Sequence, residues 1–195
     1  MKISAFLILL LASTQTAWAD IENPCADLWF SRNAMLDRAG YCFSSTLGKA
    51  LFDNSDCTTK QPQVPDRTAA QIALIRQLEQ GNSDGFYDKC HIDTSLATLD
   101  LPDQGLRKQL EFQPATDGGT GICFGYQGEE QPVYAAPWET ATKLGMIRQG
   151  DDVTLAHLDW NGWSFSTISN NGRARVMGWY RTPISDGRQC RAFAG

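Results

Sequence analysis

Six cysteines, all placed behind an apolar N-terminal segment, constrain this chain more than any other feature. The segment opens with Lys2, continues as an apolar run from Ala5 to Ala12, and reaches the small residues Ala17 and Ala19. Small residues at these two positions are typical of a signal-peptidase site, which predicts a signal peptide over residues 1–19. A run of eight residues is also much shorter than the roughly 20 that span a membrane.

The residues after the predicted cut argue against a lipid anchor. A bacterial lipoprotein needs a cysteine directly behind the cut, whereas Asp20 stands there and Cys25 lies further on. We therefore expect a periplasmic or secreted protein without a membrane anchor. We also expect the protein to be a monomer.

The cysteines are expected to form three disulfides. An oxidising compartment allows thiols to pair, and their even number leaves no obligatory free thiol. Structural zinc sites usually bring two ligands within two to four residues, but the closest pair here, Cys42 and Cys57, has fourteen residues between its members. Six cysteines allow 15 pairings, which sequence alone does not decide. Our hypothesis is Cys42 with Cys57, Cys25 with Cys90, and Cys123 with Cys190.

The charge distribution excludes some partners. Without residues 1–19 the formal charge changes from −5 to −6, because this segment holds one Lys and no acid. Residues 20–120 contain 9 basic and 15 acidic side chains, and residues 121–195 contain 7 of each. Neither part has the basic surplus needed to neutralise phosphates, so we expect no binding to nucleic acid or to an anionic membrane.

The first half of the chain is predicted to be helical. Apolar residues recur at helical spacing over residues 26–39, and Gly40 can end this helix in a left-handed turn. A short second helix is expected to start at Ser45. A third is expected to be capped by Asp66 and stopped by Gly81.

The second half is predicted to form strands. Short apolar stretches are separated by turn residues, and Asn161-Gly162 is a strong hairpin signal. This pattern is typical of a small antiparallel barrel. Residues 115–121 have linker composition, which places a boundary near Gly118. Residues 84–112 remain unassigned except for a short helix over 105–110.

Residues 28–43, LWFSRNAMLDRAGYCF, resemble the core of the YARHG domain family. The family's name string is altered at Leu36, Asp37 and Ala39. Residues 51–52 and 72–79 follow the same family's later pattern. The resemblance implies an exported bacterial protein and no established activity. The signature residues that match are Arg32, Asn33, Arg38, Gly40, Tyr41 and Phe43.

Residues 133–181 resemble a bacterial SH3-type barrel through three segments. These are residues 143–145 before a turn at 149–151, residues 161–163, and residues 177–180. The usual first-loop cluster is replaced by residues 134–138, in a loop that often contacts ligands in that family. The whole arrangement also resembles an uncharacterised family of Gram-negative secreted proteins. The expected fold is therefore α+β: a disulfide-stapled helical module over residues 20–117, followed by an SH3-like β-barrel over residues 118–195.

Signals for catalysis are weak. His91 adjoins a cysteine expected to be oxidised, and His157 is placed on a predicted strand, so both are expected to be structural or surface residues. The acidic pairs 53/56, 129/130 and 151/152 are interpreted as solvated turn residues, and no hydrolase or phosphate-loop motif occurs. We expect no metal, no cofactor and no enzymatic activity.

Two groups of residues could bind a ligand. Arg32, Asn33 and Arg38 are interpreted as structural residues or as an anionic-ligand site. The C-terminal half holds seven Tyr and Trp residues, more than a small core easily contains, so some should be exposed for stacking on sugars or peptides. Trp163 and Trp179 are expected in the core, and Tyr134, Trp138 and Trp160 at a binding surface.

The sequence thus favours a non-enzymatic binding protein of the cell envelope. Its expected partner is peptidoglycan or its peptides, by resemblance to other bacterial barrels, or an envelope protein. The alternative is an envelope enzyme, or an enzyme regulator, with a site between the two modules built from Arg32, Arg38 and loop carboxylates.

Overall fold

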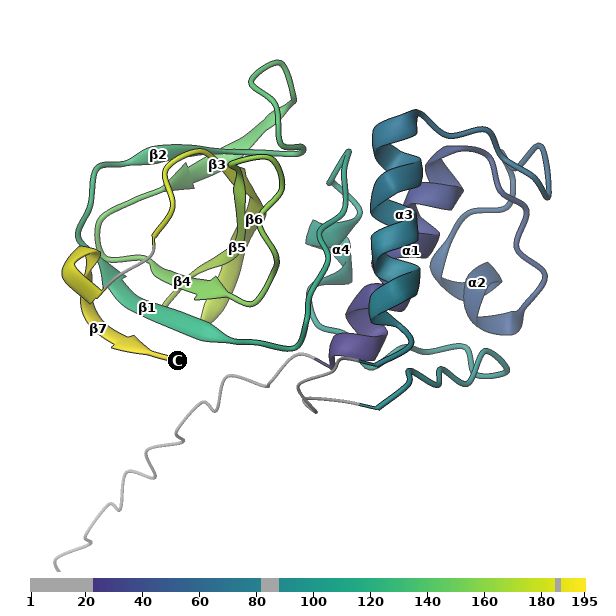
Figure 1. Cartoon of the computed structure of the whole chain (residues 1–195), viewed down its shortest axis with the longest axis horizontal. Coiled ribbons are helices and arrows are strands. Elements are labelled where there is room, and N and C mark those ends of the chain that lie inside the picture. Colours follow the sequence, from purple (N-terminus) through teal and green to yellow (C-terminus); the bar gives the residue numbers. More distant parts are fainter. Residues whose placement is uncertain (1–22, 82–87, 185–186) are drawn as a thin grey trace, which may run out of the picture.

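A computed structural model describes residues 23–81, 88–184 and 187–195, and the expected signal peptide lies outside these ranges. The fold is α+β, as predicted, with a helical N-terminal region followed by an antiparallel sheet (Figure 1). Helix α4 lies between the sheet and the pair formed by α1 and α3. The helices are α1 (Pro24–Arg38), α2 (Thr46–Leu51), α3 (Asp66–Leu78) and α4 (Gln104–Arg107).

Helix α1 confirms the first predicted helix, with a start two residues earlier. The side chain of Asn23 caps it by accepting hydrogen bonds from the backbone N–H groups of Cys25 and Ala26. Pro24 then suits the first turn, where its missing N–H is not needed. After the helix, Gly40 adopts φ of 78°, the left-handed turn expected of this glycine.

Helices α2 and α3 differ in how they begin. The Ser45 hydroxyl accepts a hydrogen bond from the backbone N–H of Gly48, which confirms the predicted start of α2. The prediction for α3 was wrong in one respect, because Pro65 occupies the cap position and no side chain caps the helix. Asp66 is instead the first helical residue, where its charge complements the positive end of the helix dipole.

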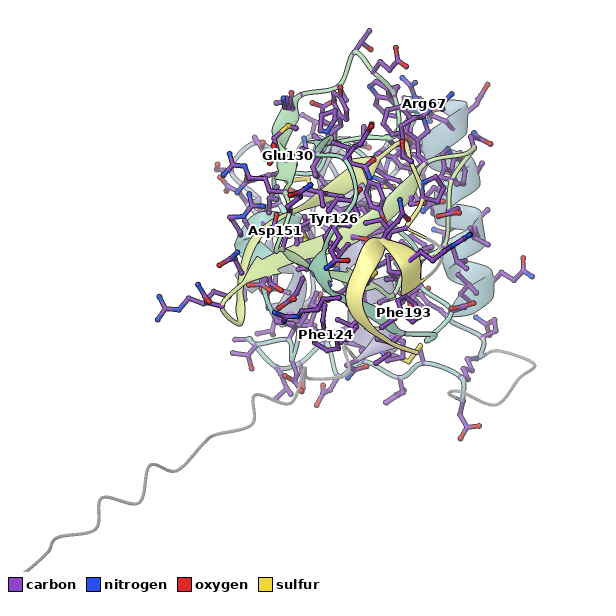
Figure 2. All side chains as sticks on the ribbon, turned by 90° about the vertical axis from the view of Figure 1, so that its left-hand side faces the viewer. Arg67, Phe124, Tyr126, Glu130, Asp151 and Phe193 are labelled. Carbon is purple, nitrogen blue, oxygen red and sulfur yellow. A yellow bond between two sulfur atoms is a disulfide. The ribbon has the colours of Figure 1, made fainter. Side chains whose placement is uncertain are left out.

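The sheet has seven antiparallel strands in the order β3-β2-β6-β5-β4-β1-β7. Its described pairings run from β3 to β7 and do not close, so the predicted closed SH3-like barrel is not confirmed. The last strand, β7, pairs with β1, so β3 and β7 are the two edge strands of the described sheet. Phe124 and Phe193 lie partly exposed on this β1–β7 pair (Figure 2). The strands are β1 (Gly121–Tyr126), β2 (Gln131–Tyr134), β3 (Lys143–Ile147), β4 (Asp152–Leu155), β5 (Ser164–Asn170), β6 (Arg173–Tyr180) and β7 (Cys190–Ala194), with a 3-10 turn at Gly187–Gln189 before β7.

The predicted Asn161-Gly162 turn is present. Both residues have positive φ, 48° and 76°, and the turn joins Trp160 to Trp163 through a β-bridge. Two residues with positive φ form the hairpin turn that matches the twist of antiparallel strands.

Strand β6 contributes to two apolar clusters, one from each face. Val176 and Tyr180 belong to the cluster inside the sheet, whereas Met177 and Trp179 belong to a second cluster. Residues alternate between the two faces of a strand, so the sheet is apolar on both sides here. The second cluster is completed by residues that precede the sheet, among them Leu110 and Phe112.

Residues 104–116 fasten the helical region to the sheet. The Trp179 indole N–H donates to the Phe112 carbonyl at 2.8 Å, and the Phe112 N–H donates to the Ala135 carbonyl at 3.1 Å. Ala115, at the start of the expected linker, is 1% exposed and packs with α1 and α3. The first part of the expected linker is therefore buried, whereas Thr120, directly before β1, is exposed.

Three disulfides join Cys25 to Cys90, Cys42 to Cys57, and Cys123 to Cys190, as hypothesised. The first ties the start of α1 to the segment behind α3, and the third ties β1 to β7.

The disulfides predict the thiol content of the purified protein. The denatured protein without residues 1–19 is expected to consume no thiol reagent before reduction and six equivalents after it, since all six cysteines are paired. Titration of two or more thiols before reduction would contradict the three pairings.

Candidate functional site

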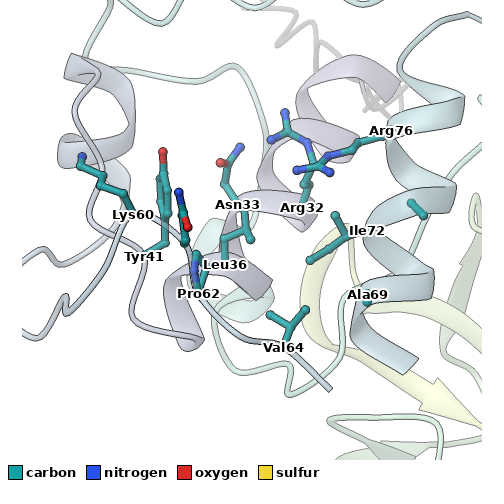
Figure 3. A pocket seen from close by; sticks show the side chains of 12 residues that line it. Arg32, Asn33, Leu36, Tyr41, Lys60, Pro62, Val64, Ala69, Ile72 and Arg76 are labelled. Atoms are coloured by element: carbon teal, nitrogen blue, oxygen red, sulfur yellow. The ribbon is translucent and has the colours of Figure 1, made fainter. Parts of the chain in front are cut away.

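A cavity of about 510 Å³ opens between α1, α3 and the segment around residues 60–64 (Figure 3). Two of the predicted site residues, Arg32 and Asn33, line it, together with Tyr41 of the same signature. The complete lining is Arg32, Asn33, Leu36, Tyr41, Lys60, Gln61, Pro62, Val64, Ala69, Ile72, Ala73 and Arg76.

Two guanidinium groups define one end of this cavity. The Nε and Nη2 atoms of Arg32 donate to the Glu79 carboxylate at 2.9–3.1 Å, and the two side chains are 20% and 14% exposed. Arg32 thus pairs with a carboxylate from another segment. Arg76, in the last turn of α3, is exposed and extends toward the same end of the cavity (Figure 3). This end of the cavity therefore holds two cationic side chains, of which Arg32 is paired with a carboxylate.

Lys60 and Tyr41 form the other end (Figure 3). The Lys60 ammonium donates to the Cys42 carbonyl and, at 3.4 Å, to the Ser44 hydroxyl. It also lies 5.6 Å from the centre of the Tyr41 ring, within the range of a cation–π contact. These contacts hold the ammonium at the cavity while part of it stays exposed to solvent.

The middle of the cavity combines apolar side chains with the polar Asn33 (Figure 3). Leu36, Val64 and Ile72 supply its floor, and Asn33 is tied back to α1 because its amide donates to the Trp29 carbonyl at 2.7 Å. The lining holds three basic side chains and no acidic one, in a chain whose formal charge is −5. The cavity is thus a local positive site on an acidic protein.

Arg38 lies apart from Arg32 and Asn33. Its Nη2 donates to the Lys108 carbonyl at 2.9 Å, which ties the end of α1 to the segment behind α4. It lines a different hollow of about 510 Å³ together with Asp37 and Asp56. Burial, and then the neighbouring Asp56 carboxylate, raise the pKa of Asp37.

The three aromatic residues predicted to bind a ligand are partly buried. Tyr134, Trp138 and Trp160 all pack against the second sheet cluster. Trp160 lies 5.1 Å from Phe112 between ring centres, and the Arg67 guanidinium lies 4.2 Å from the centre of the Trp138 ring.

Trp163 and Trp179 are buried, as predicted, at 4% and 0% exposure. We expected the core of the sheet domain to be too small for its seven Tyr and Trp residues. This expectation did not take into account the second apolar cluster, which contains Trp163 and Trp179. Leu110 and Phe112 cover the outer face of the sheet and give the rings a second layer to pack in.

A buried group of charges joins the helical region to the sheet domain. One oxygen of the Asp27 carboxylate on α1 lies 3.0 Å from Arg107 Nη1 on α4, and the other lies 2.7 Å from His157 Nε2. The side chains of all three are at most 1% exposed. Burial alone would raise the pKa of Asp27, but Arg107, His157 and the Ser31 hydroxyl together lower it well below its usual range.

This group contains Ser, Asp and His but not the geometry of a catalytic triad. Ser31 and His157 both contact the Asp27 carboxylate, whereas a triad places His between the other two. His157 lies in the loop behind β4, not on the predicted strand. We interpret Asp27, Arg107 and His157 as an ion cluster that fixes one module against the other.

Asp151 corrects the interpretation of the acidic pairs as solvated. It is 2% exposed, forms an ion pair with Arg175, and accepts a hydrogen bond from the backbone N–H of Arg148 at 2.8 Å (Figure 2). A turn residue is buried here because the Arg175 side chain from β6 reaches across to it.

Sequence reasoning missed Lys60 and Arg76, and only Arg76 has a weak signal in the sequence. Ala69, Ala73 and Arg76 recur at spacings of four and three, which places them on one face of α3. Two small side chains followed by an arginine on one helix face indicate a shallow surface depression with a positive charge at one end. Lys60, in contrast, is brought to the cavity by the chain beyond the Cys42–Cys57 disulfide, which no periodicity reveals.

Two negative findings apply to residues 23–81, 88–184 and 187–195. No helix within these ranges has the length and apolarity required to cross a membrane. Within the same ranges, no three or more His, Cys, Asp or Glu side chains are grouped so that they could hold a metal ion.

Comparisons with known proteins identify two families. The sequence model of the YARHG domain matches residues 4–80, which supports the resemblance seen around α1. The model of a domain of unknown function, DUF4453, matches residues 89–195, more than half of the chain. No curated protein and no solved structure matches the chain. The YARHG match and the three disulfides indicate a non-cytoplasmic, oxidising compartment.

Proposed function

The chain belongs to the DUF4453 family, and since that family's description assigns no activity, we propose from the geometry that this protein is a non-enzymatic binding protein of the bacterial cell envelope. It is exported to the periplasm or secreted, and it binds an anionic ligand. Peptidoglycan, through its peptides, is the proposed source of that ligand.

The observation that carries this proposal is the positive cavity between α1 and α3. Binding sites for small ligands are concave, with an apolar lining and a few polar groups that fix orientation. The cavity has this composition, and its volume of about 510 Å³ is within the usual range for such sites. Three signature residues of the YARHG family, Arg32, Asn33 and Tyr41, lie in its wall.

The aromatic residues of the sheet domain are proposed as a second contact with the wall. Trp138, beneath Arg67, lines a smaller hollow of about 280 Å³ that also contains Arg38. An aromatic ring beside a guanidinium is a suitable surface for an extended peptide or a sugar face. We also propose that the sheet domain is an open relative of bacterial SH3-type barrels, with β7 added beyond the strands of such a barrel.

A second candidate is an envelope enzyme. It is favoured by the hollow in which Arg38 lies beside Asp37, because a carboxylate with a raised pKa next to solvent can act as a general acid.

Sedimentation with purified peptidoglycan tests the proposal. The protein without residues 1–19 is expected to sediment with the wall, and Arg76→Gln is expected to reduce the bound fraction several-fold, because a charge-assisted hydrogen bond is lost. Trp138→Ala together with Trp160→Ala is expected to reduce it further. Arg173→Gln, which removes the same charge from an exposed position on β6, is the matched control.

The same incubation separates the two candidates. A binding protein releases no soluble wall fragments, whereas an enzyme releases fragments in a manner that Asp37→Asn abolishes. Wild-type protein that stays in the supernatant would remove the wall as the ligand source.

A further inference from the structure

Resting on the proposed function, we propose that the cavity between α1 and α3 recognises a short peptide that carries two carboxylates separated by apolar residues. One carboxylate binds at the Arg32–Arg76 end and the other at the Lys60–Tyr41 end.

The arginine end has donors to spare. A guanidinium has five N–H donors in a planar fork, and Arg32 directs the Nε and Nη2 side of its fork to Glu79. This ion pair fixes the group and leaves its Nη1 edge for another acceptor. Among the described residues, the Arg76 guanidinium has no ion pair, so the charge of Glu79 does not balance both arginines. A ligand carboxylate would neutralise the remaining positive charge of the two arginines, and a guanidinium can bind it through two parallel hydrogen bonds.

The lysine end has one position to fill. An ammonium has three donors, and Lys60 uses two of them on the Cys42 carbonyl and the Ser44 hydroxyl. Neither acceptor is charged, and Lys60 forms no ion pair with any described acidic residue. The Tyr41 ring beside it holds the ammonium in place, so the third donor is available to an anion without further ordering of the side chain.

The space between the ends selects against a compact anion. Leu36, Val64 and Ile72 offer only apolar contact there, and a phosphate or sulfate ion has nothing to place on them. Ala69 and Ala73 are exposed, and their small side chains keep this part of the cavity open. A ligand that contacts both ends therefore has apolar groups between its charges, as a peptide with alanine-like residues does.

Calorimetric titration of the protein without residues 1–19 with N-acetyl-Glu-Ala-Ala tests this inference. This probe has one side-chain carboxylate and one terminal carboxylate, with apolar groups between them. Removing either one, as N-acetyl-Gln-Ala-Ala or as the C-terminal amide, is expected to weaken binding about tenfold or more.

Protein variants identify which end holds which carboxylate. Arg76→Gln is expected to weaken binding of the full probe about tenfold and to abolish the effect of removing one of its carboxylates. Lys60→Gln is expected to do the same for the other carboxylate. Ala73→Leu fills the cavity and is expected to abolish binding, whereas Ala70→Leu, on the same helix but outside the lining, is the matched control.

Three results would overturn the inference. In the first, Arg76→Gln binds the probe as tightly as the Arg173→Gln control does. In the second, the probe binds equally well after one of its two carboxylates has been removed. In the third, inorganic phosphate competes with the probe as strongly as unlabelled probe does. The wall experiment is separate: if the protein sediments with peptidoglycan yet ignores these peptides, the proposed function stands and this site does not. If the peptides bind as described but the protein does not sediment with peptidoglycan, the site stands and its ligand comes from another source.

Discussion

Replacing Asp27 with Asn is expected to lower the free energy of unfolding by about 3–5 kcal/mol, the cost of removing one partner from a buried ion pair. The Asn side chain has the same shape but no charge, so Arg107 stays buried beside a neutral amide and the contact to His157 weakens. Urea unfolding at pH 7 measures the loss as a lower midpoint with an unchanged slope. Asp100→Asn, at an exposed position, is the control and should change stability little.

The pH dependence of stability tests the same cluster. Because the pKa of Asp27 in the folded protein is lowered, its contribution is complete above the ordinary carboxyl pKa of about 4 and is lost as the pH falls below that value. The difference in stability between wild type and Asp27→Asn should therefore shrink as the pH falls below about 4. A variant as stable as wild type at pH 7 would show that the cluster does not hold a charged carboxylate.

Removing the Cys123–Cys190 disulfide by double substitution with Ala is expected to cost about 4 kcal/mol of stability. The two cysteines are 67 residues apart, so their bridge restricts a large part of the unfolded chain. It also holds β7, an edge strand that pairs only with β1 among the described strands.

The Cys42–Cys57 disulfide provides an internal comparison for this variant. Its separation is 15 residues, for which the same chain-entropy argument gives a smaller loss of about 3 kcal/mol. Urea unfolding of the two double variants, each compared with wild type, measures both losses. A smaller loss for Cys123–Cys190 than for Cys42–Cys57 would contradict the argument from chain entropy.

Local features of the fold could be predicted because neighbouring residues determine them. The helix at Pro24–Arg38 ends at a glycine with positive φ, and the Asn161-Gly162 turn has the backbone that this dipeptide favours. The cysteine pairing was also correct, and the predicted signal peptide was what made disulfides the natural interpretation.

Features that depend on distant residues could not be predicted. Asp27 and His157 are 130 residues apart, and their contact follows from how the helical region packs on the sheet. A single acidic residue among apolar neighbours near the start of α1 was the available signal, but nothing in the sequence named its partners. The pairing of β1 with β7 likewise joins segments far apart in the chain, and turn chemistry does not determine it. For the candidate site, Arg32 and Asn33 were identified, whereas Lys60 is brought to the cavity only by the tertiary structure.

The Cys25–Cys90 disulfide and the Asp27–His157 contact both cross the border between the two family segments, 4–80 and 89–195. A natural or engineered exchange of either segment for a relative's version must bring matching partners at these positions. An exchange that lacks them leaves an odd thiol on one side and a bare buried carboxylate on the other. The two segments are therefore expected to be inherited together. A hybrid between distant relatives should fold only when each segment brings its partner for both contacts, Cys25–Cys90 and Asp27–His157.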